Sequence, residues 1–227
     1  MNNIIELKNI SKDFKNKKLK VLKSISYKFI LGNIYSIMGP SGSGKSTLLN
    51  LISLIDHPSN GSILINGSKI NYLDQEQNDI LRSKNIGIVY QDKNLLNDFT
   101  LLENVYLAKL ATTNDKYLAI KEAKKIIKSV GLSSRMDHYP SELSGGEAQR
   151  TAICRALINS PKIILADEPT GNLDQKNSKI IFNMLIKLKN KSRIIIYATH
   201  NRYFADMADC KIELNDGKIN TIYGVHK

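Results

Sequence analysis

The residues with the most definite chemistry lie in one glycine-rich stretch, GPSGSGKST, at residues 39–47. Gly39, Gly44, Lys45 and Ser46 satisfy the spacing G-x-x-x-x-G-K-[ST], and the stretch lies between two apolar segments. Such a loop directs successive backbone N–H groups at a phosphate, and the dipole of the helix that follows adds to the attraction. The sequence therefore predicts a phosphate cradle (P-loop) that binds a nucleotide.

Each part of this loop has an expected role. The backbone N–H groups of residues 42–47 should surround the β-phosphate, and Lys45 should place its charge beside the β- and γ-phosphates. The hydroxyl of Ser46 should ligate Mg²⁺. The ligands predicted here are ATP and Mg²⁺, and the predicted phosphate-contacting residues are Gly39, Pro40, Ser41, Gly42, Ser43, Gly44, Lys45, Ser46 and Thr47.

Two adjacent carboxylates follow a second apolar segment, KIILADE, at residues 162–168. Ligands of an open α/β sheet bind at the carboxyl ends of its parallel strands. We expect Asp167 to hold Mg²⁺ through water, and Glu168 to be the base that activates the attacking water. The alternative is a purely structural acidic pair at a strand end.

A second stretch also has the composition of an anion site. In PSELSGGEAQR, residues 140–150, Ser144, Gly145 and Gly146 stand directly before a run with helical character. Small residues and a hydroxyl at a helix N-terminus leave free N–H groups for an anion. The chain therefore carries two phosphate sites about a hundred residues apart, which one nucleotide does not explain.

Elements that position these residues follow from periodicity and from turn signals. Strands are expected at 4–10, 21–30, 33–38, 61–67, 85–91, 162–167 and 193–199, with a hairpin at 211–223 around an Asp-Gly turn and a Lys/Asn-rich turn after the first strand. Helices are expected at 45–55, 100–110, 117–132, 147–159 and 175–189, with Gly131 closing one and Pro161 ending another.

This alternation predicts an α/β fold with a mainly parallel core sheet, an N-terminal antiparallel β subdomain and a helical subdomain. We expect one domain over residues 1–227. Its nucleotide-binding core should comprise residues 1–91 and 151–227, and the helical subdomain residues 92–150.

Composition narrows the functional classes. Of 227 residues, 42% are hydrophobic and 24% charged, no apolar run is long enough to span a bilayer, and the opening MNNIIELKNI is unlike a secretory signal. A cytoplasmic protein is therefore expected.

Cys154 and Cys210 suggest neither a zinc site nor a disulfide. The net charge of +12 raises the hypothesis of nucleic-acid binding. The lysines are scattered and no nucleic-acid motif accompanies them, so no nucleic-acid partner is expected. Attraction to an anionic membrane leaflet is the milder interpretation.

Taken together, the P-loop, the carboxylate pair and LSGGE at 143–147 resemble the ATPase subunits of ABC transporters over essentially the whole chain. In this family LSGGE is called the signature, and the resemblance implies a head-to-tail homodimer in which each P-loop faces the partner's signature across ATP. Ser144, Gly145 and Gly146 would then contact the ATP held by the second copy, which accounts for two phosphate sites in one chain. It also implies two transmembrane permease subunits and peripheral attachment at the cytoplasmic side of the inner membrane.

Other positions match motifs of this family. The resemblance implies that Gln91 senses Mg²⁺ and the γ-phosphate, that Asp174 in GNLD crosses the dimer interface, and that His200 in YATH contacts the γ-phosphate. Phe14 stands where the family usually stacks a Tyr on adenine; a core aromatic is the alternative. Two residues depart from the pattern: Ala148 replaces a long polar residue, and Asn201 replaces a common Asp.

Within the family, GIVYQDKNLLNDFTLLENV and SVGLSSRMDHYPSELSGGE resemble the lipoprotein-releasing (LolD) branch. That branch implies LolC/LolE-like membrane partners and transfer of lipoproteins to a periplasmic carrier. MacB-type exporters of peptides, macrolides or antimicrobial compounds and FtsE-type cell-division ATPases are the alternatives. A DNA-repair or translation ATPase would need a long coiled coil or a second cassette, and the sequence has neither. Leu95, Leu96 and Phe99 are expected either to dock a membrane subunit or to fill the helical core.

Overall fold

The computed structural model describes residues 3–14 and 19–224 of the 227-residue chain. The beginning of the chain and most of the turn expected after the first strand therefore lie outside the described residues. Among the described residues, no helix combines the length and the apolar character that crossing a membrane requires.

The expected parallel sheet has six strands in the order β10-β9-β3-β8-β7-β6. All of its neighbouring pairs are parallel except β9–β10, the predicted hairpin. Its strands are β3 (Ile34–Met38), β6 (Ile86–Val89), β7 (Ile163–Asp167), β8 (Ile194–Ala198), β9 (Cys210–Asn215) and β10 (Lys218–Gly224). The order brings the carboxyl ends of β3, β8, β7 and β6 to one edge.

A second, antiparallel sheet has the order β2-β1-β4-β5, which confirms the predicted N-terminal β part. Its strands are β1 (Asn3–Phe14), β2 (Leu19–Ile30), β4 (Asn60–Ile65) and β5 (Ser68–Lys69). The first two are longer than the sequence pattern indicates, because pairing continues through several register shifts.

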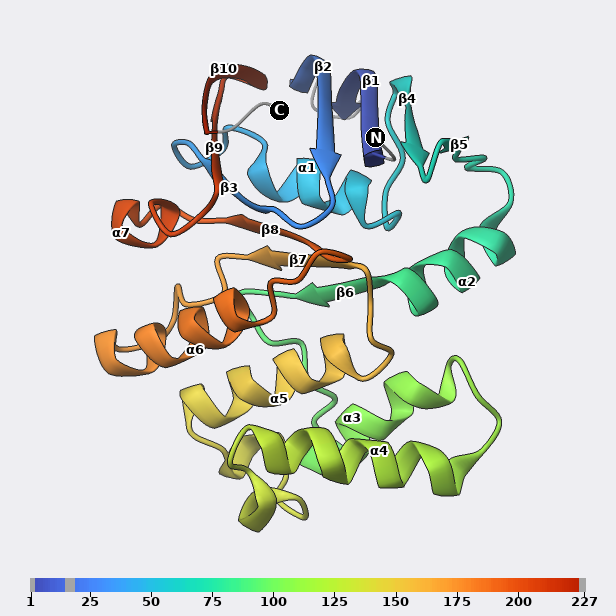
Figure 1. Cartoon of the computed structure of the whole chain (residues 1–227), viewed down its shortest axis with the longest axis vertical. Coiled ribbons are helices and arrows are strands. Elements are labelled where there is room, and N and C mark those ends of the chain that lie inside the picture. Colours follow the sequence, from blue (N-terminus) through green and yellow to red (C-terminus); the bar gives the residue numbers. More distant parts are fainter. Residues whose placement is uncertain (1–2, 15–18, 225–227) are drawn as a thin grey trace.

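The helices cover both faces of the parallel sheet. Figure 1 shows α1 between the two sheets, α5 and α6 on the opposite face of the parallel sheet, and α3 and α4 beyond α5. The helices are α1 (Lys45–Ile52), α2 (Gln75–Asn85), α3 (Leu101–Leu110), α4 (Lys116–Ser129), α5 (Gly145–Leu157), α6 (Gln175–Lys187) and α7 (Arg202–Ala205), with 3₁₀ turns at Ser133–Arg135 and Pro140–Glu142.

The central strands are buried on both faces, as their continuous apolar runs predict. In β8, Ile194 and Ile196 pack into the cluster that includes α1 and the antiparallel sheet. The alternate residues Ile195 and Tyr197 pack into the cluster around Phe182 of α6. Because successive strand side chains point to opposite faces, one strand contributes to two cores.

Helix α5 likewise belongs to two cores. Ile153 packs with the parallel sheet and α6, whereas its neighbour Cys154 packs with α3 and α4. Cys154 and Cys210 are both buried, free thiols. The signature helix is therefore held between the sheet and the outer helices.

Sequence periodicity missed two helices. Helix α2 has no buried residue, so it lacks an apolar stripe; its signal is Asp74, which caps the helix by accepting from the N–H of Gln77. Helix α7 spans only four residues.

Helix α1 is shorter than predicted because Leu54 takes a left-handed φ of 61°. Gly131 follows the end of α4 with a φ of 74°, in keeping with its predicted closing role.

Replacing Gly87 of β6 with alanine should destabilise the fold, because β6 and α5 meet there without room for a side chain. An added Cβ would lie 2.3 Å from the carbonyl oxygen of Ala156 and 2.9 Å from Pro161. We expect Gly87→Ala to lower the free energy of unfolding by about 1–3 kcal/mol in urea titrations. Ser68→Ala, at an exposed strand position, should change it by less than about 0.5 kcal/mol. Equal stabilities for the two variants would contradict this packing.

Candidate nucleotide-binding site

The P-loop connects β3 to α1, as predicted, and its glycines adopt conformations that other residues avoid. Gly39 has a φ of 155°, and a Cβ there would lie 2.0 Å from the carbonyl oxygen of Leu214. Gly44 precedes α1 with a φ of 104°, and its Cβ would lie 2.7 Å from the side chain of Leu22. The loop therefore needs glycine at both positions to lie this close to the neighbouring strands.

Lys45 folds back over this loop. Its Nζ donates hydrogen bonds to the carbonyl oxygens of Gly39, at 2.8 Å, and Pro40, at 3.0 Å. These carbonyls hold the ammonium group at the mouth of the cradle. A lysine with three donors can keep such contacts and still reach an anion.

Four segments far apart in the sequence meet at one cavity of about 570 Å³. A volume of this size is typical of small-molecule sites. Besides most of the P-loop, the lining includes Gln91 after β6, the β7 carboxylates and His200 after β8. The predicted residues that line it are Gly39, Pro40, Ser41, Gly42, Gly44, Lys45, Ser46, Thr47, Gln91, Asp167, Glu168 and His200. Val21 of β2 also lines the cavity. The sequence did not mark it as a site residue, because a single valine within a strand belongs to no motif.

Glu168 has a strained backbone and a defined partner. Its φ is 43°, in the left-handed region, and the turn is held by hydrogen bonds from its N–H to the carbonyl of Ala198 and from the N–H of Gly171 to its own carbonyl. Its Oε1 lies 3.0 Å from Nδ1 of His200. The Glu168 side chain is 14% exposed and that of His200 is 72% exposed. Strain of this kind concentrates at functional sites.

The donor set at the carboxyl end of β7 suits a hard cation. Oδ1 of Asp167 is buried without a hydrogen-bond partner, which costs free energy unless a ligand compensates it. Among the described residues, no group of three His, Cys, Asp or Glu side chains could hold a metal. A site with one carboxylate and the hydroxyl of Ser46 fits Mg²⁺, which takes few protein ligands and keeps water and phosphate oxygens.

The signature residues lie away from this cavity. Figure 1 shows the P-loop end of α1 and the first turn of α5 on the same side of the molecule but on opposite faces of the parallel sheet. Gly146 packs against the start of α6, where a Cβ would lie 2.6 Å from Oδ1 of Asn177. Each chain thus presents two separate candidate phosphate sites.

A capping box organises the signature. The Ser144 hydroxyl accepts from the N–H of Glu147, and the Glu147 carboxylate accepts from the N–H of Ser144 at 2.8 Å. Nε of Arg135 donates to Glu147 at 2.9 Å. The hydrogen bond from Arg135, aided by those from Ser144, lowers the pKa of Glu147 to about 2. The carboxylate therefore stays charged and holds the serine at the helix start.

The remaining predicted residues also lie outside the cavity lining. Ser43 is buried beneath the loop, and its hydroxyl has no partner. Asp174 caps α6 by accepting from the N–H of Asn177, and this bond lowers the pKa of Asp174. Phe14 is exposed at the end of β1, with Nζ of Lys12 at 5.3 Å from its ring centroid. Its exposure rules out the core-aromatic alternative.

The two departures from the family pattern have structural explanations. Ala148 is buried on α5. Asn201 caps α7 by accepting from the N–H of Tyr203. Asparagine and aspartate are about equally good at such a position, so this substitution keeps the cap.

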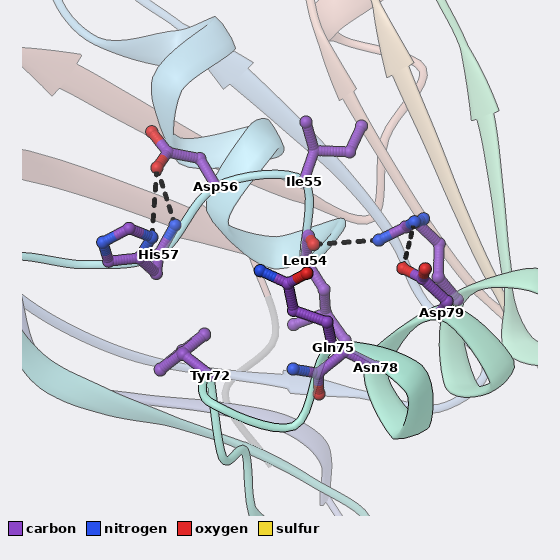
Figure 2. Close-up of a pocket in the computed structure, with 9 residues that line it drawn as sticks. Leu54, Ile55, Asp56, His57, Tyr72, Gln75, Asn78 and Asp79 are labelled. Carbon is purple, nitrogen blue, oxygen red and sulfur yellow. Dashed lines mark hydrogen bonds and ion pairs between the residues drawn. The ribbon is translucent and has the colours of Figure 1, made fainter.

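A second cavity, of about 290 Å³, lies at the far end of α1 and contains none of the predicted site residues. Figure 2 shows Asp56 turned toward His57 on one side of it and Asp79 on the other. Arg82 donates to the carbonyl oxygen of Leu54 at 3.0 Å and also pairs with Asp79. These contacts satisfy a carbonyl just beyond α1 and so anchor the helix that carries the P-loop.

A P-loop at the carboxyl edge of a mainly parallel sheet, facing a carboxylate pair, defines a P-loop nucleotide-binding domain. The chain belongs to the ABC transporter family, whose sequence model matches residues 22–171. It is the ATP-binding, ATP-hydrolysing subunit of such a transporter.

Several known proteins are similar to this chain over nearly its whole length. It is 42% identical to the lipoprotein-releasing system ATP-binding protein LolD of Rickettsia bellii, covering 96% of this chain and 98% of that protein. It is 44% identical to LolD of Wigglesworthia glossinidia brevipalpis, with the same two coverages. The dimeric ATP-binding cassette MJ0796, solved in a post-hydrolysis state with ADP and Pi, superimposes with a TM-score of 0.91 at 36% identity, covering 99% of this chain and all of that one.

The charge of Glu147 should stabilise the fold in a pH-dependent way. The pKa of Glu147, about 2, lies below the value of 4.5 that is ordinary for glutamate. The stabilisation that its charge gives to the fold is therefore complete above about pH 4.5 and is lost as the pH falls toward 2. Glutamine keeps the capping geometry but loses the ionic bond to Arg135. We expect Glu147→Gln to be less stable than the wild type by roughly 1 kcal/mol at neutral pH. The difference in the free energy of unfolding should narrow in urea titrations carried from neutral pH to well below pH 4.5, toward the lowered pKa; a constant difference over that range would contradict the assignment.

Proposed function

We propose that this chain hydrolyses ATP, as a head-to-tail homodimer, to power the release of lipoproteins from the inner membrane toward a periplasmic carrier. The observation that carries the dimer is the separation of the P-loop cavity from the signature, which leaves each chain with two half-sites. The cargo assignment is supported by the LolD relatives, whose names favour it over peptide export and cell division.

The P-loop cavity would bind the triphosphate of ATP. Backbone N–H groups of residues 42–47 and the ammonium of Lys45 would neutralise the phosphates. Ser46, Gln91 and Asp167 would hold Mg²⁺, with Asp167 acting through water. When bound, the ion would screen the negative charge of the phosphates.

Glu168 and His200 would perform the hydrolytic step. Glu168 would orient a water molecule and accept its proton as the oxygen attacks the γ-phosphorus. The 3.0 Å contact from Nδ1 of His200 would keep the carboxylate aimed, and the held turn at Glu168 limits its movement. His200, largely exposed, would be free to contact the γ-phosphate as well.

The partner copy would complete each site. Ser144 and the N–H groups of Gly145 and Gly146 would contact the γ-phosphate on the other chain, at a helix N-terminus suited to anions. Asp174, at the start of α6 beside Gly146, would lie across the interface. Phe14 would stack on adenine through its exposed ring.

Replacing Glu168 with glutamine should separate binding from hydrolysis. Glutamine cannot accept the proton, so we expect Glu168→Gln to retain ATP binding and to lower the rate of phosphate release about 10²–10⁴-fold. With Mg²⁺ and saturating ATP, light scattering should report a dimer of this variant. Near-normal phosphate release would remove Glu168 from its role. A protein that stays monomeric, alone and with its membrane subunits, would refute the paired-site function.

The segment after Gln91 would contact the two permease subunits. Leu96 is 49% exposed and Phe99 39% exposed, and neither belongs to a buried cluster, which argues against the core alternative. Buried Asn104 donates to the carbonyls of Leu96, Phe99 and Thr100 and accepts from the N–H of Leu96. Asn104 thus holds the loop in a shape that exposes both apolar side chains. Leu95 is only partly exposed.

This contact would place the protein peripherally at the cytoplasmic side of the inner membrane. The permease subunits would be of the LolC/LolE type. We also propose the division expected above: a single domain with a nucleotide-binding core at 1–91 and 151–227 and a helical part at 92–150. The cluster of α3, α4 and α5 side chains supports the helical part.

Charges on the exposed loop should uncouple hydrolysis from transport. We expect Leu96→Glu combined with Phe99→Glu to leave the circular dichroism spectrum and the ATPase activity of the isolated subunit unchanged. Co-purification with the membrane subunits should fall by about tenfold or more, because a charge buried in an apolar contact is costly. Tyr117→Glu, at an exposed aromatic on α4, is the matched control. Loss of folding in the double variant, or full retention of the complex, would contradict the docking role.

A further inference from the structure

A third cavity, of about 380 Å³, lies between α4, α5 and α6 and shares no lining residue with the P-loop cavity. Figure 1 shows α5 between the other two helices, on the face of the parallel sheet opposite α1. Seven of the ten lining side chains are apolar, and the other three are Ser129, Arg150 and Lys187. The cavity is therefore an apolar pocket with two cationic side chains in its wall.

Arg150 lines this cavity with an unpartnered guanidinium. Its Nε is buried without a hydrogen-bond partner, and among the described residues no carbonyl or carboxylate pairs with the rest of the group. Arg155, further along α5, is satisfied instead, because it donates to the carbonyls of Lys93 at 2.7 Å and Asn94 at 2.6 Å. A buried donor on a charged group costs free energy unless an acceptor reaches it. Arg150 therefore indicates a place for an acceptor that comes from another molecule.

The surroundings of the cavity favour an anion. Lys187 of α6 is the second cation in the wall, and none of the described residues that line the cavity is acidic. Helix α4 carries five lysines and one glutamate, and this Glu122 is already paired with Lys109 at 2.8 Å. Helix α6 carries three lysines and no acidic residue. A positive potential of this kind raises the local concentration of anions.

The size and the exposure of the cavity favour a small amphiphile over a protein segment. A protein interface covers about 800 Å² on each partner. Of the lining residues, Ile180, at 39%, is the one found among the exposed large hydrophobic side chains of the described chain. At about 30 Å³ per water-sized group, the cavity holds about a dozen heavy atoms. A carboxylate with one unbranched chain of about ten carbons matches this size.

We propose that the cavity between α4, α5 and α6 binds a fatty-acid carboxylate. The head group accepts hydrogen bonds from Arg150 and pairs with Lys187. The alkyl chain covers Ile153, Leu157 and Met184, which line the cavity. Burial of the chain supplies hydrophobic free energy, and the charged hydrogen bonds select an anionic head group. This second ligand site is separate from the nucleotide site, so the proposal does not depend on the proposed function.

The test titrates the full chain with decanoate in the absence of nucleotide and follows carbon-13-labelled methionine methyl groups by NMR. Met184 lines the cavity, whereas Met38 ends β3 before the P-loop and serves as the internal reference. We expect decanoate to shift the Met184 resonance saturably and to leave that of Met38 unchanged. Decanol, which has the same chain without a charge, should bind at least about tenfold more weakly. Acetate, which has the head group without the chain, should cause no shift.

Arg150→Met removes the charge but keeps an apolar side chain of similar length, so it should weaken decanoate binding by about tenfold or more. Lys179→Met, at an exposed position of α6 outside the lining, is the matched control and should change the affinity by less than about twofold. Where circular dichroism shows Arg150→Met to be unfolded, Lys187→Met gives the same comparison, because the Lys187 side chain is exposed and the fold tolerates its loss.

A folded variant of either cation that binds decanoate as the wild type does would overturn the proposal. Equal affinities for decanoate and decanol, or a Met184 resonance that decanoate leaves in place, would do the same. A Met184 shift that appears with rising protein concentration alone would assign this face to a second copy of the chain. A shift caused by an acidic, leucine-containing peptide but not by decanoate would assign it to a protein partner. Either result would replace the fatty acid as the occupant.

Discussion

The triphosphate of ATP is a dense negative charge, and binding it in a partly dry cavity requires several preorganised positive partners. One loop cannot supply both these partners and the groups that activate water. The parallel sheet solves this constraint, because the carboxyl ends of β3, β6, β7 and β8 meet at one edge. The P-loop, Gln91, the carboxylate pair and His200 reach one cavity for that reason alone.

Once the strands are in this order, the rest of the fold serves to hold their ends in place. The antiparallel sheet and α1 cover one face of the sheet, and α5 and α6 cover the other. Short-range contacts then set individual groups. The hydrogen bonds around Glu168 maintain its left-handed backbone, and Arg82 anchors the chain just beyond α1. Local strain at the edge is thus maintained by a rigid interior.

The signature obeys a different constraint. In the proposed dimer it would present backbone N–H groups to the ATP held by the partner copy. The capping box of Ser144 and Glu147, reinforced by Arg135, fixes the first turn of α5. The same helix reaches back to the Gln91 segment through Gln149 and Arg155. One helix therefore connects the signature to the segment around Gln91, which lines the P-loop cavity.

Much of the fold and of the candidate site could be predicted from the sequence, because the motifs depend on local geometry. A glycine-rich loop before an amphipathic helix, a carboxylate pair after a buried strand, and a serine three residues before Glu147 act through neighbours in the chain, so their elements and the parallel α/β class could be predicted. Periodicity failed where burial was absent, as in α2, or where the element was very short, as in α7. Only the tertiary structure decided which distant residues meet. Val21 in the cavity, His200 beside Glu168, and Arg155 on the Gln91 segment depend on strand order and on long-range packing, which no local pattern encodes.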